Sequence, residues 1–115
     1  MFLTIPYPPS VNSYWGFHGH RRFLTKKAVD FKSEVSNAVI AHNIPKLGQE
    51  RLEIEIKLFP TDKRVRDIDN SIKSCLDALC QAGVFDDDSQ IDVLIVNRGE
   101  IVKGGKAEVK LKILS

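Results

Sequence analysis

The sequence predicts an α+β fold, a small single domain over residues 1–115 in which two α-helices pack on a mainly antiparallel or mixed β-sheet. Two segments place apolar residues at the three- and four-residue steps of an amphipathic helix, and others alternate apolar and polar residues as half-buried strands do. The chain has 115 residues, 43% of them hydrophobic, and no repeat or low-complexity linker. We therefore expect one core and no second domain.

The N-terminal part predicts a strand, an irregular segment and a helix. Residues 2–6 are β-prone and stop before Pro8 and Pro9, which favours a short edge strand. Residues 11–24 show no lasting period and predict a functional loop or a loose hairpin. Thr25 is a suitable N-cap for the helix that follows. That helix carries its apolar face at Ala28, Phe31, Val35, Ala38, Val39 and His42, and the region closes at Pro45 and Gly48.

The second half predicts a strand, a helix and two further strands. Residues 52–58 alternate with period two and end at Pro60. Residues 70–82 have helical periodicity, with Asp67 or Asp69 as the cap and Gly83 as a left-handed stop. Residues 91–96 and 107–113 read as strands, joined through the glycine turn at 103–106. We expect these last two strands to form a C-terminal hairpin.

Composition limits the partners and the cellular compartment that we expect for the protein. The formal charge is +2, from 17 basic and 15 acidic residues, so the overall balance neither demands nor excludes nucleic acid. No run of about 18 apolar residues occurs, and no signal segment is recognisable. Cys75 and Cys80 lie on one helix with side chains that diverge, so no disulfide is expected. These features predict a soluble, cytoplasmic protein that does not associate with membranes.

The most informative feature is a local excess of carboxylates. Between residues 67 and 92 only Lys73 opposes seven aspartates. A basic stretch with Lys63, Arg64 and Arg66 comes just before them, and it suits a polyanion. Carboxylates beside phosphate-binding residues suggest phosphodiester chemistry with Mg²⁺, which needs few protein ligands because it keeps water and substrate oxygens in its shell. The seven are Asp67, Asp69, Asp77, Asp86, Asp87, Asp88 and Asp92.

Spacing within this cluster leaves two interpretations open. Asp69 and Lys73 share one helical face, so the ammonium can neutralise charge that develops on a phosphate held by the metal. Equally, the aspartates can be helix caps, and Asp69, Lys73 and Asp77 a ladder of exposed ion pairs. A helix over 70–82 advances about 20 Å, and the chain from Gly83 to Asp88 spans at most about 20 Å. The loop must therefore fold straight back along the helix, or Asp88 must serve a partner subunit.

The irregular segment is rich in aromatic and basic side chains. Tyr14, Trp15 and Phe17, interleaved with Arg21 and Arg22, suit stacking on splayed bases or wedging a junction, but the rings can equally pack the segment onto the core. Zinc is disfavoured because no cysteine lies at finger spacing from the histidines. An EF-hand starting at Asp67 is excluded because it requires glycine where Ile72 stands.

Short blocks of residues recur in a fixed order over nearly the full length of the chain: Pro8-Pro9-Ser10 with Asn12, residues 66–70 with Lys73, residues 77–79, Ala82-Gly83, residues 87–90 and residues 103–105. In the order and spacing of these blocks, the sequence resembles the RusA Holliday junction resolvases, which are small homodimeric, magnesium-dependent endonucleases of bacteria and prophages. The resemblance implies that Asp67, Asp69 and Asp88 hold Mg²⁺ and that Lys73 is the catalytic lysine. The basic stretch departs from the family pattern, because Val65 interrupts it and Asp62 precedes it.

The expected function is a structure-selective endodeoxyribonuclease that resolves four-way DNA junctions by paired symmetric nicks, in recombination and repair. Lys63, Arg64, Arg66 and the segment with Tyr14, Trp15, Arg21 and Arg22 are the expected DNA contacts. Two alternatives remain at this level. One is a non-catalytic DNA-binding or regulatory module, and the other is a metal nuclease acting on flaps or other branched DNA.

Overall fold

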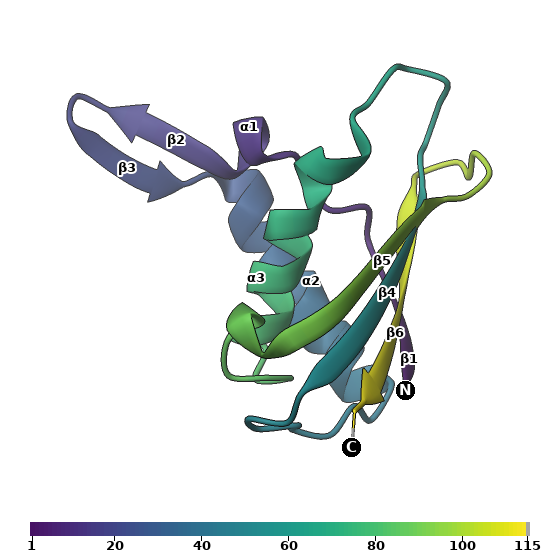
Figure 1. Cartoon of the computed structure of the whole chain (residues 1–115). Coiled ribbons are helices and arrows are strands. Elements are labelled where there is room, and N and C mark those ends of the chain that lie inside the picture. Colours follow the sequence, from purple (N-terminus) through teal and green to yellow (C-terminus); the bar gives the residue numbers. More distant parts are fainter. Residues whose placement is uncertain (115) are drawn as a thin grey trace.

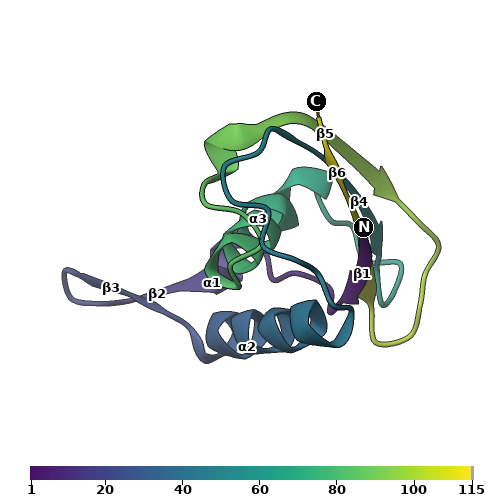
Figure 2. The ribbon, with the colours of Figure 1, turned by 90° about the horizontal axis from the view of Figure 1, so that it is seen from below.

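The computed structural model describes residues 1–114, which share one hydrophobic core. A four-stranded mixed sheet has the order β1-β6-β4-β5, and helices α2 and α3 lie on one of its faces (Figures 1 and 2). This is the α+β architecture that the sequence predicts. The sheet strands are β1 (Phe2–Ile5), β4 (Leu52–Phe59), β5 (Ile91–Arg98) and β6 (Lys106–Ile113), and the two helices are α2 (Lys26–Ala41) and α3 (Ile72–Gln81).

The remaining elements are short. Helix α1 (Val11–Tyr14) leads into a separate two-stranded hairpin of β2 (Trp15–His18) and β3 (Arg21–Leu24), which projects from the body of the molecule (Figure 1). The 3₁₀ turns are η1 (Ile68–Ser71), before α3, and η2 (Asp88–Gln90), before β5. Of the two structures predicted for residues 11–24, the hairpin is the one that forms.

Strand β4 lies in the middle of the core, because its alternating residues place one apolar set under the helices. Leu52, Ile54, Ile56 and Leu58 are all at most 1% exposed. Phe31 and Val35 from α2 belong to the same buried cluster. Burying such side chains is worth about 1.5–3 kcal/mol each relative to exposure. The period-two pattern of residues 52–58 therefore fixes which face of the sheet meets the helices.

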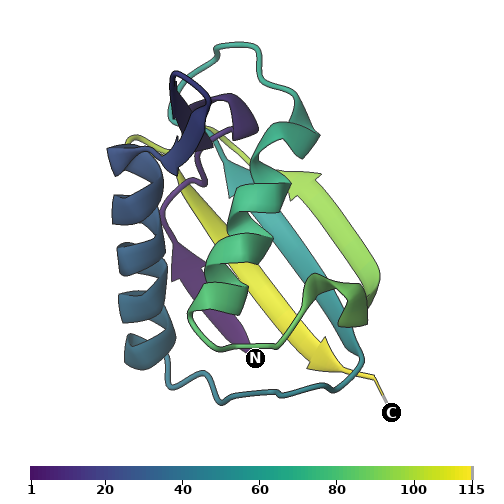
Figure 3. The same cartoon turned by 90° about the vertical axis from the view of Figure 1, so that its left-hand side faces the viewer.

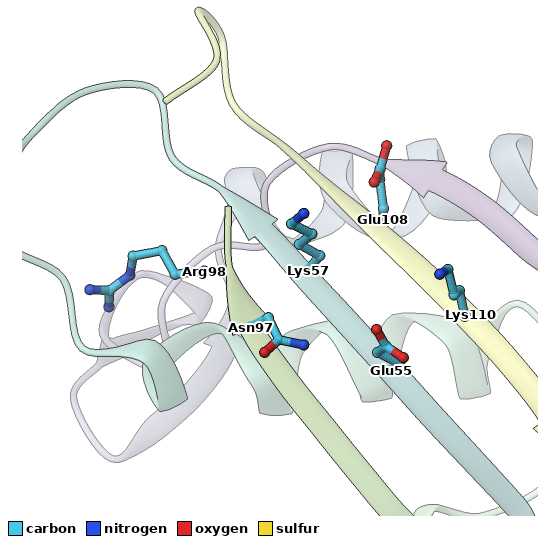
Figure 4. Close-up of a pocket in the computed structure, with 6 residues that line it drawn as sticks. All are labelled: Glu55, Lys57, Asn97, Arg98, Glu108 and Lys110. Carbon is cyan, nitrogen blue, oxygen red and sulfur yellow. The ribbon is translucent and has the colours of Figure 1, made fainter. Parts of the chain in front are cut away.

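The opposite face of the sheet is polar. Figure 4 shows a shallow hollow there, lined by side chains from three strands. Glu55 lies opposite Lys110, and Lys57 lies opposite Glu108, so charges of both signs alternate across β4 and β6. Because it carries both signs of charge, this surface is better suited to contact with water than to binding a polyanion. The other two lining residues are Asn97 and Arg98.

Several local predictions are confirmed. Strand β1 pairs only with β6 and forms one edge of the sheet. The Thr25 hydroxyl accepts a hydrogen bond from the Ala28 N–H at 3.2 Å and caps α2. Gly83 has a φ of 82° and ends the α3 region in the left-handed conformation that glycine tolerates. Both cysteines are free thiols. No helix among residues 1–114 has the length and apolarity needed to cross a membrane.

The predicted C-terminal hairpin is wrong. Strand β5 pairs in parallel with β4, and β6 pairs antiparallel with the other edge of β4, so β4 separates the two strands (Figure 3). Helix α3 is the reason: a strand, a helix and a second strand in succession form a parallel crossover unit. The crossover occupies one side of β4, and β6 takes the other. As a result β5 is an edge strand.

Candidate active site

The carboxylates at the entrance of α3 are exposed and are not used as helix caps. The prediction that Asp67 or Asp69 caps this helix is wrong, because the chain enters α3 through η1 and Ser71 becomes the N-cap. Asp67 is the N-cap residue of η1, but its side chain makes no cap hydrogen bond. Within residues 1–114 neither carboxylate forms an ion pair. Both groups therefore remain available as ligands.

Lys73 connects α3 to the loop that follows it. Its ammonium donates to Asp88 Oδ2 at 2.9 Å and lies 3.5 Å from Asp77 Oδ1. Of the two arrangements expected for Asp88, a loop that folds back along its own helix is the one seen within this chain. The hydrogen bond to Asp88, and next the charge of Asp77, raise the pKa of Lys73 above its ordinary value. Lys73 is thus a cation at neutral pH and is suited to stabilising negative charge rather than to accepting a proton.

Gln90 holds the turn that presents Asp88. Its buried side-chain oxygen accepts from the backbone N–H groups of Asp86 and Asp87, both at 3.0 Å. Its amide nitrogen donates to the carbonyls of Gly48 and Glu50 at 3.0 and 2.6 Å. All four hydrogen-bonding positions of the amide are filled. The turn is therefore tied to the segment that leads into β4.

The three consecutive aspartates have different surroundings. Asp87 is the N-cap of η2 and closes a capping box with Gln90. The Ser89 hydroxyl donates to the Asp87 carboxylate, and this bond is the main reason that the pKa of Asp87 lies below its ordinary value. The Asp86 side chain is exposed. Asp88 is the member that faces Lys73.

The described residues of a single chain do not complete a metal site. Within residues 1–114, no group of three or more Asp, Glu, His or Cys side chains lies close enough together to hold a metal ion. The donor chemistry nevertheless fits Mg²⁺, which prefers carboxylate oxygens and binds proteins through as few as one or two of them. Asp67 and Asp69 are two neighbouring carboxylates without an ion pair in the described residues, whereas Asp88 is paired with Lys73.

The basic stretch divides into a structural and a free part. Arg66 binds Asp62 Oδ1 at 2.9 Å and also donates to the Asp62 and Arg64 carbonyls. The backbone N–H of Arg64, followed by the Arg66 side chain, lowers the pKa of Asp62. Arg66 therefore shapes the 62–66 turn. Lys63 and Arg64 have exposed side chains that form no ion pair in the described part of the chain.

The aromatic residues of the projecting hairpin also have separate roles. Tyr14 is only 2% exposed, so it packs the base of the hairpin onto the core, the second of its two predicted roles. The Arg22 guanidinium lies 4.0 Å from the centre of the Trp15 ring, a cation–π contact. Phe17, another of the residues predicted to stack on bases, is 71% exposed and lies opposite Arg22 in the hairpin, whereas the exposed Arg21 lies opposite His18.

The sequence-based prediction of the site does not include Lys27, although the Lys27 side chain lines a cleft that reaches Asp67. One signal in the sequence points to it. No acidic residue occurs before Asp30, whereas Arg21, Arg22, Lys26 and Lys27 do. A long segment that contains cations but no anions gives a positive charge to the surface that it forms. Motif searches based on residue spacing do not detect this kind of feature.

Comparison with known proteins confirms the resemblance seen in the sequence. The model of the family described as endodeoxyribonuclease RusA matches residues 6–113. The crossover junction endodeoxyribonuclease RusA of Enterobacteria phage HK97 is 35% identical over 109 residues, covering 95% of this chain and 91% of the relative. The proteins of that name from Shigella sonnei and Escherichia coli K12 are each 30% identical over 110 residues, with the same coverage. The chain therefore belongs to the RusA family of endodeoxyribonucleases.

Proposed function

We propose that this protein is a Mg²⁺-dependent endodeoxyribonuclease that resolves four-way DNA junctions in recombination and repair. The observation that carries the proposal is the arrangement around α3. Asp67 and Asp69 are exposed at its entrance and form no ion pair among residues 1–114, and Lys73 follows one turn after Asp69. The Asp88 that lies 2.9 Å from Lys73 belongs to the same chain and is held by this contact apart from those two carboxylates. The names of the relatives supply the substrate class, a crossover junction in DNA.

Each side chain has a separate task in the proposed reaction. Asp67, Asp69 and Asp88 hold Mg²⁺, which when bound lowers the pKa of water and so supplies a nucleophile at neutral pH. The Lys73 ammonium stabilises the negative charge that grows on the phosphate oxygens, the electrostatic work that phosphoryl transfer mainly requires. Asp77 lies on the other side of Lys73 and helps keep it protonated.

A second copy of the chain completes this site in our proposal. No strand among residues 1–114 pairs with the outer edge of β5, and Val93, Leu94 and Ile95 on it are 36%, 43% and 38% exposed. Such an apolar edge strand, without a proline or lysine to block it, is a surface for strand pairing. An antiparallel β5–β5 contact is two-fold symmetric and joins the same surface of both copies.

This pairing also explains how the separated carboxylates meet. Asp88 lies in η2, directly before the start of β5, whereas η1 contacts β5 and the Arg98 side chain at the end of β5 donates to the Arg66 carbonyl at 2.6 Å. In an antiparallel pair, the start of one β5 lies beside the end of the other. Asp88 of the partner subunit is thereby brought toward Asp67 and Asp69.

The remaining exposed groups provide the DNA grip. Lys63 and Arg64 bind backbone phosphates, and the hairpin presents Phe17, Trp15 and the arginines Arg21 and Arg22 to unstacked bases at the branch point. Two sites related by the two-fold axis act on opposed strands of a four-way junction. The products are paired symmetric nicks.

The decisive experiment is incubation with a synthetic four-way junction, with and without Mg²⁺, followed by mapping of the cut strands. We expect symmetric Mg²⁺-dependent nicks from the wild type. Asp69→Asn should abolish them while leaving junction binding intact or tighter, because one negative charge facing the DNA is removed. Asp86→Asn is the matched control, since Asp86 is an exposed aspartate outside the proposed ligand set, and it should cut normally.

Two results contradict the proposal in different ways. If Asp69→Asn retains Mg²⁺-dependent cleavage, the assignment of this ligand is wrong. If the wild type is indifferent to Mg²⁺ in both cleavage and thermal stability, the protein is a binding module instead. Parallel assays on flap and linear DNAs of the same sequence distinguish a junction resolvase from a nuclease for other branched structures.

A further inference from the structure

A cleft of about 610 Å³ extends from Asp67 toward the start of α2. One wall is the segment from Tyr7 to Ser10, and the other is the basic turn before η1. Lys27, in the first turn of α2, lines the same cleft, so segments far apart in the sequence meet around it. Its volume is within the range of about 300–1,000 Å³ that is typical of binding sites.

The charges in this cleft favour an anion. Lys27, Arg64 and Arg66 line it, and Asp67 at its end is the only carboxylate among the lining residues. In the described part of the chain, neither Lys27 nor Arg64 forms an ion pair through its side chain. The hollow on the polar face of the sheet, in contrast, alternates both signs (Figure 4).

The position of Lys27 has no structural explanation. Cations in the first turn of a helix are unfavourable because that end of the helix dipole is positive, and the first turn of α2 contains no acidic residue. Lys26 is compensated by Asp30, whose Oδ2 lies 2.9 Å from its ammonium. Lys27 forms no such ion pair with any residue of the described chain. A lysine kept at an unfavourable position and turned toward a cleft is best explained by an external anion.

We propose that this cleft holds the sugar–phosphate backbone of the strand that is cut, and that Lys27 binds a phosphate next to the one attacked. The inference rests on the proposed function and adds a binding residue to it. The phosphodiester chain enters past Lys27 and Arg64 and reaches Asp67. The partly exposed ring of Tyr7, which lines this cleft next to the buried Pro8 and Pro9, offers an apolar surface to the sugars.

The test compares two neighbouring lysines. Lys27→Ala and Lys26→Ala remove one positive charge each from the same turn of α2, but only Lys27 lines the cleft. Binding to a synthetic four-way junction is measured without divalent metal, over a series of salt concentrations. Lys27→Ala should weaken binding and reduce the slope of log K against log salt by about 0.9, the value for one lost phosphate contact. Lys26→Ala should leave affinity and slope near those of the wild type, and Lys27→Arg should restore them.

Equal behaviour of Lys27→Ala and Lys26→Ala, with both variants melting like the wild type, overturns the inference. This result does not affect the proposed nuclease activity, because binding is measured without cleavage. Conversely, a wild type that binds junctions through Lys27 but makes no Mg²⁺-dependent cut supports the cleft and refutes the proposed function. The two failures are therefore distinguishable.

Discussion

Gln90 shows how one buried amide positions a candidate ligand. Its oxygen is shared by two backbone N–H groups of the 86–88 turn, and its nitrogen bridges the carbonyls of Gly48 and Glu50. Glutamate or leucine has a similar size but cannot satisfy both pairs. The position thus requires both a donor and an acceptor, although Gln90 itself faces no substrate.

Replacing Gln90 by Ala should destabilise the protein by about 1–3 kcal/mol, the cost of leaving buried polar groups without partners. The turn should also loosen, so that Asp88 is presented less often and cleavage falls more than junction binding does. Urea unfolding measures the first effect, and single-turnover cleavage beside an equilibrium binding assay measures the second. Unchanged unfolding would show that water replaces the amide without loss.

The two thiols differ in burial, and their reactivity should differ with it. Complete burial raises the pKa of Cys75 to about 12. Cys80 is partly exposed and donates to the Asp86 carbonyl at 3.2 Å; partial burial, and then the negative charge of Asp87, raise its pKa as well. The thiolate is the reactive form, so a raised pKa slows the reaction and moves it to higher pH.

We therefore expect iodoacetamide to modify Cys80 slowly at pH 8 and faster as the pH rises, and to leave Cys75 unmodified while the protein is folded. Mass spectrometry of the labelled peptide reports both sites. Denatured protein, in which both cysteines should react alike, is the control. Rapid labelling of Cys75 in the native state would mean that α3 separates from the sheet.

At the level of elements, β5 combines an unpaired edge with exposed apolar side chains. Leu94 is 43% exposed, and a monomer would leave this surface in water. A 115-residue chain buries only about two-thirds of its unfolded surface, so association supplies useful additional burial.

Leu94→Lys should therefore convert a dimer to a monomer and abolish cleavage without unfolding the chain. Ile40→Lys is the matched control, because Ile40 is a 73% exposed residue of α2, a helix that contacts β1 at the opposite edge of the sheet. Analytical ultracentrifugation gives the oligomeric state, and circular dichroism checks the fold. If both variants sediment like the wild type, β5 is not the interface.

The sequence predicted local structure well where short-range chemistry decides it. Thr25 caps α2 because its hydroxyl needs only the N–H three residues later, and the strand over 52–58 forms because alternation fits one buried face. The pairing of β5 was beyond such rules. It depends on α3, which lies between β4 and β5 in the sequence and allows β5 to pair in parallel with β4. Strands β5 and β6 therefore each pair with β4 and not with each other.

In the candidate site, too, some features follow from the local sequence and others only from the tertiary structure. Helical spacing drew attention to Lys73, the family resemblance drew attention to Asp88, and the structure shows the two side chains in contact at 2.9 Å. The place of Lys27 in the cleft depends on which segments meet in three dimensions, whereas Arg66 differs from Arg64 through its ion pair with Asp62 in the same turn. The cap predicted at Asp67 or Asp69 was wrong because the 3₁₀ turn η1 precedes the helix, which begins at Ile72 with Ser71 as its N-cap.

At the scale of the whole molecule, the carboxylates lie in two groups along β5. Asp67 and Asp69 are beside its end, and Asp88 is before its start. If the sites are shared between two copies, each contains Asp69 from one subunit and Asp88 from the other. If they are not shared, each needs both residues from the same subunit.

A mixture of two inactive variants distinguishes these arrangements. Asp69→Asn and Asp88→Asn should each be inactive alone as homodimers. In a shared-site heterodimer, both substitutions fall in one site, and the other site receives intact Asp69 and Asp88. Mixing the two variants and allowing subunit exchange should therefore restore nicking, with one cut per junction instead of paired cuts. Sites built within one subunit leave every heterodimer inactive, so a mixture without activity, despite subunit exchange verified by mass spectrometry, contradicts the shared site.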